Sequence, residues 1–157
     1  VIDTTTVTAN AVLNVTKAMS AVAGNAGTGP YTVTLSYSNT GNTPASNLVL
    51  SDPLPAGMVY VPGSARWSVT GPTVILTDAA DGTQGTAPTI AYDFGASTAG
   101  QATATINNVA AGQSGTVSFQ VNVQAGLPVS TLNIRLPNEN TSDCGPSGLP
   151  SACSGEA

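Results

Sequence analysis

The sequence contains no histidine, only two cysteines and very little charge. Without histidine it lacks the commonest general base, the usual catalytic triads and most catalytic metal sites. Charged residues make up 7% of the 157 residues, whereas soluble domains carry about 25%. With Lys17, Arg66 and Arg135 as the only cations and a net charge of −5, the chain has no basic face to neutralise phosphates, which argues against nucleic acid. We therefore expect neither an enzyme nor a cofactor or metal.

Long apolar runs are also missing. No segment approaches the roughly 18 residues of a spanning helix, and the scarce cations remove electrostatic attraction to anionic membranes, so we expect no membrane insertion. Val1 does not begin a signal peptide, so we expect that an exported protein would already have lost its leader. What remains is rich in Val, Thr, Gly and Pro, a composition that favours β-strands joined by turns.

Apolar and polar residues alternate with a period of two in several segments, as in half-buried antiparallel strands. The clearest are "YTVTLSYSN" (31–39), "TVSFQVNV" (116–123) and "ATATIN" (102–107), and further strands are expected in "NLVLSD", "ARWSVTG", "TVILTD" and "TIAYDF". The one candidate helix, 18–26, contains Gly24 and has no charged face. Short strands separated by Gly, Pro, Asn and Asp predict an all-β fold, a two-sheet antiparallel sandwich.

The segment "YTVTLSYSNTGNTPASNLVLSDPLPAGMVYVPGSA" resembles the conserved repeat domain of bacterial and archaeal surface proteins. The matching positions run from Tyr31 to Asn39 and continue with Gly41, Ala45, Leu48, Asp52, Leu54, Pro55, Gly57 and Tyr60. "LNVTK" (13–17) and "VAAGQSGTVSFQVNV" (109–123) also match, so the resemblance covers roughly residues 13–131. It implies an Ig-like sandwich of unknown biochemical function, in a secreted protein that is extracellular or on the cell surface.

The stretch "NTGNTPASNLVLSDPLPAG" (39–57) has the composition of a functional loop. Its chemistry favours a structural role instead. "NTGN" is a turn signal in which Gly41 is free to take a positive φ, and Asn39 and Asp52 are suited to accept hydrogen bonds from nearby amides. Pro53 and Pro55 remove two donors and end the strand. We predict a crossing between strands rather than a binding site.

The two cysteines, Cys144 and Cys153, have no zinc-site or redox spacing. A local disulfide that closes a Gly/Pro-rich loop is the favoured interpretation, and two free thiols in a tail are the alternative. A disulfide would place the protein in an oxidising compartment. The predicted organisation is an N-terminal extension (1–12), an Ig-like sandwich (13–136) and a C-terminal tail with the disulfide (137–157).

Candidate chemical groups are few. Asp78, Asp81 and Asp93 could form a carboxylate pair for glycoside hydrolysis, but solvated turns are the favoured interpretation. "TDAADGTQG" (77–85) has oxygens for Ca²⁺ but lacks the spacing of a calcium-binding loop. Lys17 could form an isopeptide crosslink with an asparagine if it were buried beside a carboxylate; an exposed lysine at a strand end is favoured. "NVT" (14–16) and "NTS" (140–142) are glycosylation sequons, so surface glycans are a possible partner.

The two ends of the chain differ. Residues 6–15 alternate strongly, with one face made by Val7, Ala9, Ala11, Leu13 and Val15, whereas the last alternating segment, "STLNIRLPNEN", is broken by Pro137. Residues 1–15 could therefore leave their own sandwich and complete that of a neighbouring copy as a donor strand, with the five apolar residues filling its pockets. The alternatives are a long first strand within the same domain and a loose tail.

Donation from head to tail does not close on itself, so it builds a filament. The sequence thus predicts a structural subunit of an extracellular filament or pilus-like fibre whose partners are copies of itself. The first alternative is a monomeric spacer or adhesin module of a larger surface protein. The second is a carbohydrate-binding module, for which Trp67 would be the sole indole available to contact a sugar.

Overall fold

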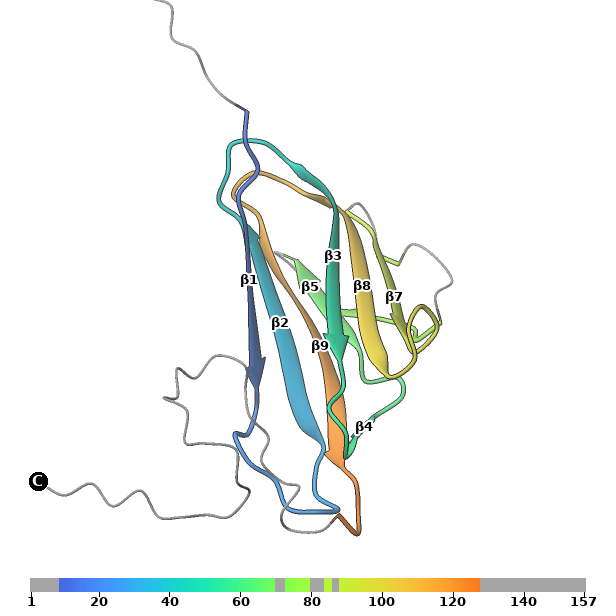
Figure 1. The fold of residues 1–157 in the computed structure, drawn as a ribbon. Coiled ribbons are helices and arrows are strands. Elements are labelled where there is room, and N and C mark those ends of the chain that lie inside the picture. Colours follow the sequence, from blue (N-terminus) through green and yellow to red (C-terminus); the bar gives the residue numbers. More distant parts are fainter. Residues whose placement is uncertain (1–8, 70–72, 80–83, 86–87, 128–157) are drawn as a thin grey trace, which may run out of the picture.

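The protein is an antiparallel sandwich of two β-sheets, as seen in a computed structural model that describes residues 9–69, 73–79, 84–85 and 88–127 (Figure 1). The strands are β1 (Leu13–Met19), β2 (Tyr31–Asn39), β3 (Ala45–Pro53), β4 (Met58–Tyr60), β5 (Arg66–Val69), β6 (Val74–Ile75), β7 (Ile90–Phe94), β8 (Gln101–Val109) and β9 (Ser114–Val123). The six-stranded sheet has the order β1-β2-β9-β5-β6, with β4 also paired to β9. The three-stranded sheet has the order β3-β8-β7. The predicted all-β two-sheet sandwich is confirmed.

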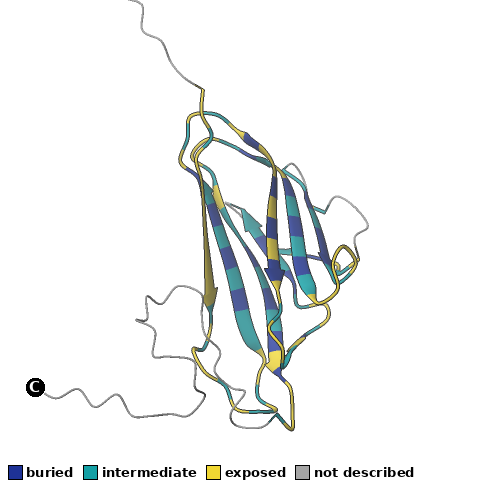
Figure 2. Cartoon of the chain, viewed as in Figure 1, coloured by how far each residue is buried: buried dark blue, intermediate teal, exposed yellow. Residues whose placement is uncertain are grey.

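The central strands follow the alternation of the sequence. In β2 the buried side chains are Val33, Leu35 and Tyr37, and the residues between them are only partly buried. Their partners across the ladder lie on β9, where Phe119 stands opposite Val33 and Val117 opposite Leu35. Residues that are directly opposite share one face of the sheet, so these two strands line the same side of the core. Figure 2 shows the alternation as bands along β2, β8 and β9.

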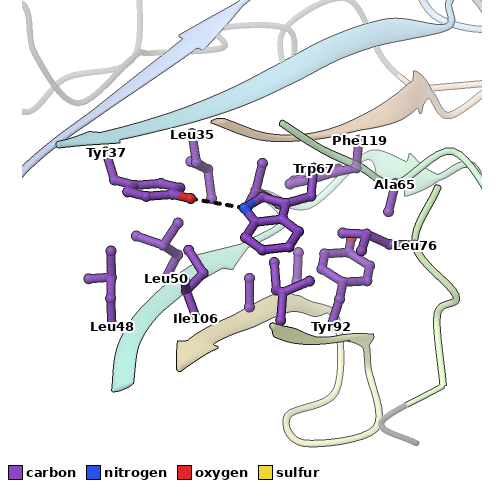
Figure 3. Close-up of a cluster of buried hydrophobic side chains, with 14 of the residues drawn as sticks. Leu35, Tyr37, Leu48, Leu50, Ala65, Trp67, Leu76, Tyr92, Ile106 and Phe119 are labelled. Atoms are coloured by element: carbon purple, nitrogen blue, oxygen red, sulfur yellow. Dashed lines mark hydrogen bonds between the residues drawn. The ribbon is translucent and has the colours of Figure 1, made fainter. Parts of the chain in front are cut away.

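The core is built around Trp67 (Figure 3). Its side chain is 3% exposed, and the indole N–H donates a 2.9 Å hydrogen bond to the Tyr37 hydroxyl. Gly115, directly opposite Tyr37 in the ladder, leaves the space that the phenol ring occupies, because a Cβ there would collide with the Tyr37 hydroxyl oxygen. The interpretation of Trp67 as an exposed sugar-binding indole is therefore wrong, since the ring is part of the hydrophobic core.

Strand boundaries differ from the predicted ones where the local pattern is weak. "TVILTD" was expected to be a full strand, but only Val74 and Ile75 pair, and β4, a strand of three residues, has no alternation long enough to predict it. Of the alternating segment 6–15, residues 6–8 lie outside the described residues, and β1 runs from Leu13, where the predicted sandwich begins, to Met19. Residues 18–26 form no helix: β1 ends at Met19, and the chain continues through turns to Tyr31.

Candidate functional site

The turn after β2 is organised by Asn39, whose side chain is buried in the sandwich. Its Oδ1 accepts hydrogen bonds from the backbone N–H groups of Gly41, at 3.0 Å, and Val12, at 3.1 Å. Its Nδ2 donates to the carbonyl oxygens of Thr43, at 2.7 Å, and Val109, at 3.0 Å. The predicted role of Asn39 as an acceptor within a turn is confirmed, and the side chain also ties together the N-terminal segment and the end of β8.

Gly41 forms part of the turn but does not use the left-handed conformation that is open to it, since it is not among the residues with a positive φ. Instead, a Cβ at this position would lie within 2.8 Å of the Ala11 Cα and would collide with the Asn10 carbonyl oxygen and the Val12 nitrogen. The N-terminal segment passes directly over the turn, and only glycine permits that approach.

Hydrogen bonds then fasten this N-terminal segment to the turn. The Thr40 N–H donates to the Val12 carbonyl at 2.8 Å, and the Asn42 N–H donates to the Asn10 carbonyl at 2.9 Å. In the other direction, the Asn10 N–H donates to the Asn42 side chain at 2.7 Å. Residues 10–12 therefore extend the pairing of β1 beyond the strand itself. We call residues 10–12 and 39–42 together the N-terminal clamp.

Beyond the clamp, β1 pairs antiparallel with β2 over its whole length, from Leu13 opposite Asn39 to Met19 opposite Val33. No side chain of β1 is buried: six of its seven residues are exposed, and Met19 is partly buried. The strand is coloured as exposed along nearly all of its length in Figure 2. Main-chain hydrogen bonds, rather than apolar burial, hold β1 in place.

The five residues predicted to contact a neighbouring subunit fall in different places. Val7 lies outside the described residues, Ala9 is exposed, and Ala11 packs in part against the core of its own chain. Leu13 and Val15 lie on β1 and pair with β2 of the same chain, yet their side chains remain 40% and 51% exposed. Whether they pair in the same way with a second copy stays a prediction.

Lys17 forms the one ion pair found among the described residues, with Nζ lying 2.6 Å from Asp52 Oδ1. The lysine side chain is 29% exposed and that of Asp52 is 9% exposed. Lys17 projects from β1 and Asp52 from β3, so the pair connects the two sheets at their edge. Lys17 is thus not a free lysine at a strand end, and the group it contacts is an aspartate rather than the asparagine that the isopeptide hypothesis requires.

The carboxylates considered for glycoside hydrolysis have structural partners. Asp78 accepts hydrogen bonds from the Tyr60 hydroxyl at 2.6 Å and the Gly63 N–H at 2.7 Å. Asp93 accepts bonds from the N–H groups of Ala96 and Ser97 and so caps the turn that follows β7. Asp81 lies outside the described residues. Asp78 and Asp93 are therefore not free carboxylates facing solvent, and each one fixes a loop.

Burial around Tyr60 changes its titration. Burial, reinforced by the hydrogen bond to Asp78, raises the pKa of Tyr60 to about 12. Tyr92 donates a 3.3 Å hydrogen bond to the Tyr60 hydroxyl. The pKa of Tyr92 is also raised, mainly by burial and, to a smaller extent, by this hydrogen bond with Tyr60. Both phenols stay protonated at neutral pH, so this cluster connects strands and offers no base.

Sequence reasoning did not find the shallow groove of about 490 Å³ on the outer face of the larger sheet. Its floor contains a row of hydroxyls formed by residues that stand opposite one another on four strands: Thr16, Ser36, Thr116 and Ser68. The polar residues that alternate with the apolar ones in each strand could have indicated these hydroxyls. Their alignment into one row depends on the register between strands, which a sequence does not give. The groove has no charged lining residue.

The remaining candidates lie largely outside the described residues. Of the proposed calcium segment 77–85, the structure describes 77–79 and 84–85, where the Gln84 side chain accepts a 2.7 Å hydrogen bond from the Thr77 N–H. In the part of the chain that is described, no three Cys, Asp or Glu residues gather into a metal-binding group. The same part contains no helix long and apolar enough to cross a membrane. Cys144, Cys153 and the sequon at Asn140 lie beyond Leu127, the last described residue.

The structure is thus an all-β sandwich whose N-terminal strand, β1, is hydrogen-bonded to β2 along its length but has no buried side chain. Comparison of the chain with protein-family models found no matching family. Neither the curated proteins nor the solved structures gave a match. The resemblance to surface-protein repeat domains therefore stays a prediction from the sequence.

Proposed function

We propose that this protein is a structural subunit of an extracellular filament or pilus-like fibre, in which the N-terminal strand of one copy pairs with the sandwich of the next. One observation carries the proposal: β1 is paired along its full length, yet none of its side chains is buried. A strand held mainly by main-chain bonds leaves its own domain without opening the hydrophobic core.

Exchange of β1 between copies would preserve the contacts that the strand makes in its own chain. The ladder between β1 and β2, the N-terminal clamp and the ion pair between Lys17 and Asp52 all recur when the strand comes from a neighbour. Residues 20–30, which connect β1 to β2, are the segment that must open. Reciprocal exchange would give a closed dimer, whereas exchange in one direction leaves a free strand at one end and a free edge at the other, and so propagates a filament.

The surface composition is compatible with a subunit that is largely surrounded by neighbours. Only 7% of residues are charged, and the outer groove is lined by hydroxyls and amides rather than ions. Soluble monomers ordinarily keep many interspersed charges on their surface. A spacer module of a larger surface protein would be compatible with the same low charge, so the decisive evidence must come from β1.

A disulfide between β1 and β2 tests the proposal directly. We would introduce Thr16→Cys and Ser36→Cys, which stand opposite each other on the outer face, after replacing Cys144 and Cys153 by serine. Opposed residues in an antiparallel pair have the Cα separation that a disulfide needs. If β1 is exchanged, oxidation of the assembled protein links successive subunits covalently. Electrophoresis without reductant then shows a ladder of multimers that collapses to monomer on reduction.

The matched control places the same pair of cysteines between β2 and β9, at Thr34 and Ser118. These strands belong to one core and are not exchanged, so this variant should give only crosslinked monomer even when filaments are present. Monomer from the variant with cysteines at 16 and 36, in a sample that electron microscopy shows to be filamentous, would overturn strand exchange. Monomer with no filaments at any concentration would favour the spacer module.

A further inference from the structure

Strand β3 is an edge strand within the described part of the chain, regular from Leu48 to Pro53 and bulged at Asn47, which has a positive φ and no partner in the register. Its one partner there is β8, and the hydrogen-bonding edge on the other side of the strand is open. β3 is nine residues long, and its inward side chains Leu48 and Leu50 are part of the hydrophobic core. A long, open edge beside a core is a site where another strand adds.

The other sheet leaves apolar side chains uncovered beside this edge. In the ladder, Leu13 and Val15 stand opposite residues of β2 on the same face of the sheet as Lys17, and Lys17 reaches Asp52 near the end of β3. β1 and β3 run in the same direction (Figure 1), so Val15 and then Leu13 lie progressively closer to the start of β3 than this ion pair does. Both side chains face the space next to the β3 edge, and 40% or more of each is exposed.

The chain leaves the described region close to the same place. After β9, the Gln124 N–H donates a 2.8 Å hydrogen bond to the Gly57 carbonyl, and a Cβ on Gly57 would lie 2.7 Å from Leu127 Cδ1. Gly57 follows Pro53, the last residue of β3, by a short loop. The chain therefore continues from a point near the end of β3 at which the edge is open.

The sequence that follows Leu127 suits this edge. Leu132, Ile134 and Leu136 alternate with Asn133 and Arg135, and Pro137 follows. Six residues, 131–136, span about 20 Å as a strand, and residues 128–130 provide a short connection. Proline has no N–H to donate, so pairing is expected to stop there.

We propose that residues 131–136 add to the free edge of β3 in their own chain, as an antiparallel fourth strand of the smaller sheet. Leu132, Ile134 and Leu136 face inward and cover Leu13 and Val15, while Asn133 and Arg135 face solvent. The direction follows from the geometry, because a chain that starts near the end of β3 must run back along it. The proposal does not depend on filament formation, because the contacts to Leu13 and Val15 are the same whether β1 comes from the same chain or from a neighbouring copy.

A disulfide scan of the full chain tests this pairing. Val49 on β3 points outward and is 55% exposed, so Val49→Cys would be combined in turn with Thr131→Cys, Asn133→Cys or Arg135→Cys, with Cys144 and Cys153 replaced by serine. We expect one of the three pairs to oxidise to a crosslinked monomer under mild conditions, with loss of both thiols. That pair gives the register.

The control combines the same three cysteines with Ile75→Cys, which is exposed on β6 at the far edge of the larger sheet, and no monomeric crosslink is expected. Multimers from the Val49 variants would show that the segment pairs with a neighbour and would overturn the assignment to its own chain. As a second readout, Ile134→Pro should speed hydrogen exchange in the amides of residues 45–53. Unchanged exchange there, together with no crosslink in any Val49 variant, would overturn the proposal.

Discussion

Asn39 connects three segments that are distant in the sequence: the N-terminal segment, the turn after β2 and the end of β8. Its main chain adds a fourth connection, because its carbonyl accepts a 2.8 Å bond from Gly112 and its N–H donates a 2.9 Å bond to the Gln113 carbonyl. A buried amide that satisfies all of its hydrogen-bonding capacity fixes geometry rather than binding a ligand. The loop-like stretch 39–57 therefore owes its polar composition to the fold.

Replacing Asn39 with alanine should be among the most destabilising single changes at a polar residue. The substitution removes four side-chain hydrogen bonds and leaves buried backbone groups without partners, so we expect a loss of about 3 kcal/mol in the free energy of unfolding. Denaturant unfolding measures this loss. The control is Asn14→Ala, which removes an exposed bond to Thr40 and should cost no more than about 0.5 kcal/mol; equal losses would contradict the role of Asn39.

Gly41→Ala should loosen the N-terminal clamp without unfolding the sandwich. Its Cβ would collide with residues 10–12, so the Thr40 and Asn42 amides, which donate to that segment, should exchange with solvent faster. Hydrogen exchange followed by NMR measures both amides. The Gly112 amide, bonded to the Asn39 carbonyl on the other side of the turn, is the internal control, and its acceleration to the same degree would indicate global unfolding instead.

Alkaline pH should destabilise the protein through its buried tyrosines. The pKa of Tyr60 is about 12 in the fold, compared with 10.0 for an unperturbed phenol. Above pH 10 the unfolded chain therefore loses this proton more readily than the folded one, and the free energy of unfolding falls as pH rises from about 10 to 12. Urea unfolding across this range measures the slope. Tyr60→Phe should reduce it; an unchanged slope would show that Tyr60 is not responsible.

At the scale of the strand, the sequence predicts the strands that have one buried and one more exposed face, and it does not locate the strands that lack this difference. The buried alternation of β2, β8 and β9 is visible in the sequence because one face of each packs on the core. The sequence alone does not locate β1 within the alternating segment, because the alternation begins upstream of Leu13 and no side chain of β1 is buried to fix the register. The clamp and the ion pair could not be predicted, since both depend on which strands lie side by side.

The ion pair at the edge should contribute modestly to stability. Lys17 and Asp52 lie 2.6 Å apart with the lysine partly in solvent, so we expect a coupling energy of about 1 kcal/mol. A double-mutant cycle with Lys17→Met and Asp52→Asn measures this coupling. Because the pair is partly exposed, its strength should decline at high salt, and a coupling of zero at low salt would show that the contact does not stabilise the edge.

For the whole molecule, assembly should depend on β1 rather than on the residues before the clamp. A chain lacking residues 1–9 keeps the clamp and β1, so it should still form filaments, whereas a chain lacking residues 1–15 loses the clamp and the first part of β1 and should not. Negative-stain electron microscopy at matched concentrations measures this difference. Circular dichroism checks that the shorter chain is still folded; folded filaments from that chain would remove β1 as the linking element.

The positions of the cations determine where trypsin can cut the chain. Trypsin cleaves after Lys or Arg, and in the described part of the chain these are Lys17, within β1, and Arg66, the first residue of β5. A protease binds its substrate as an extended, unpaired segment, so neither bond is accessible while its strand is hydrogen-bonded. Cleavage after Lys17 then requires β1 to separate from β2. At a protease concentration where cleavage outpaces re-pairing, the rate of that single cut reports how often the strand detaches, which sets the upper limit on how fast copies can exchange it.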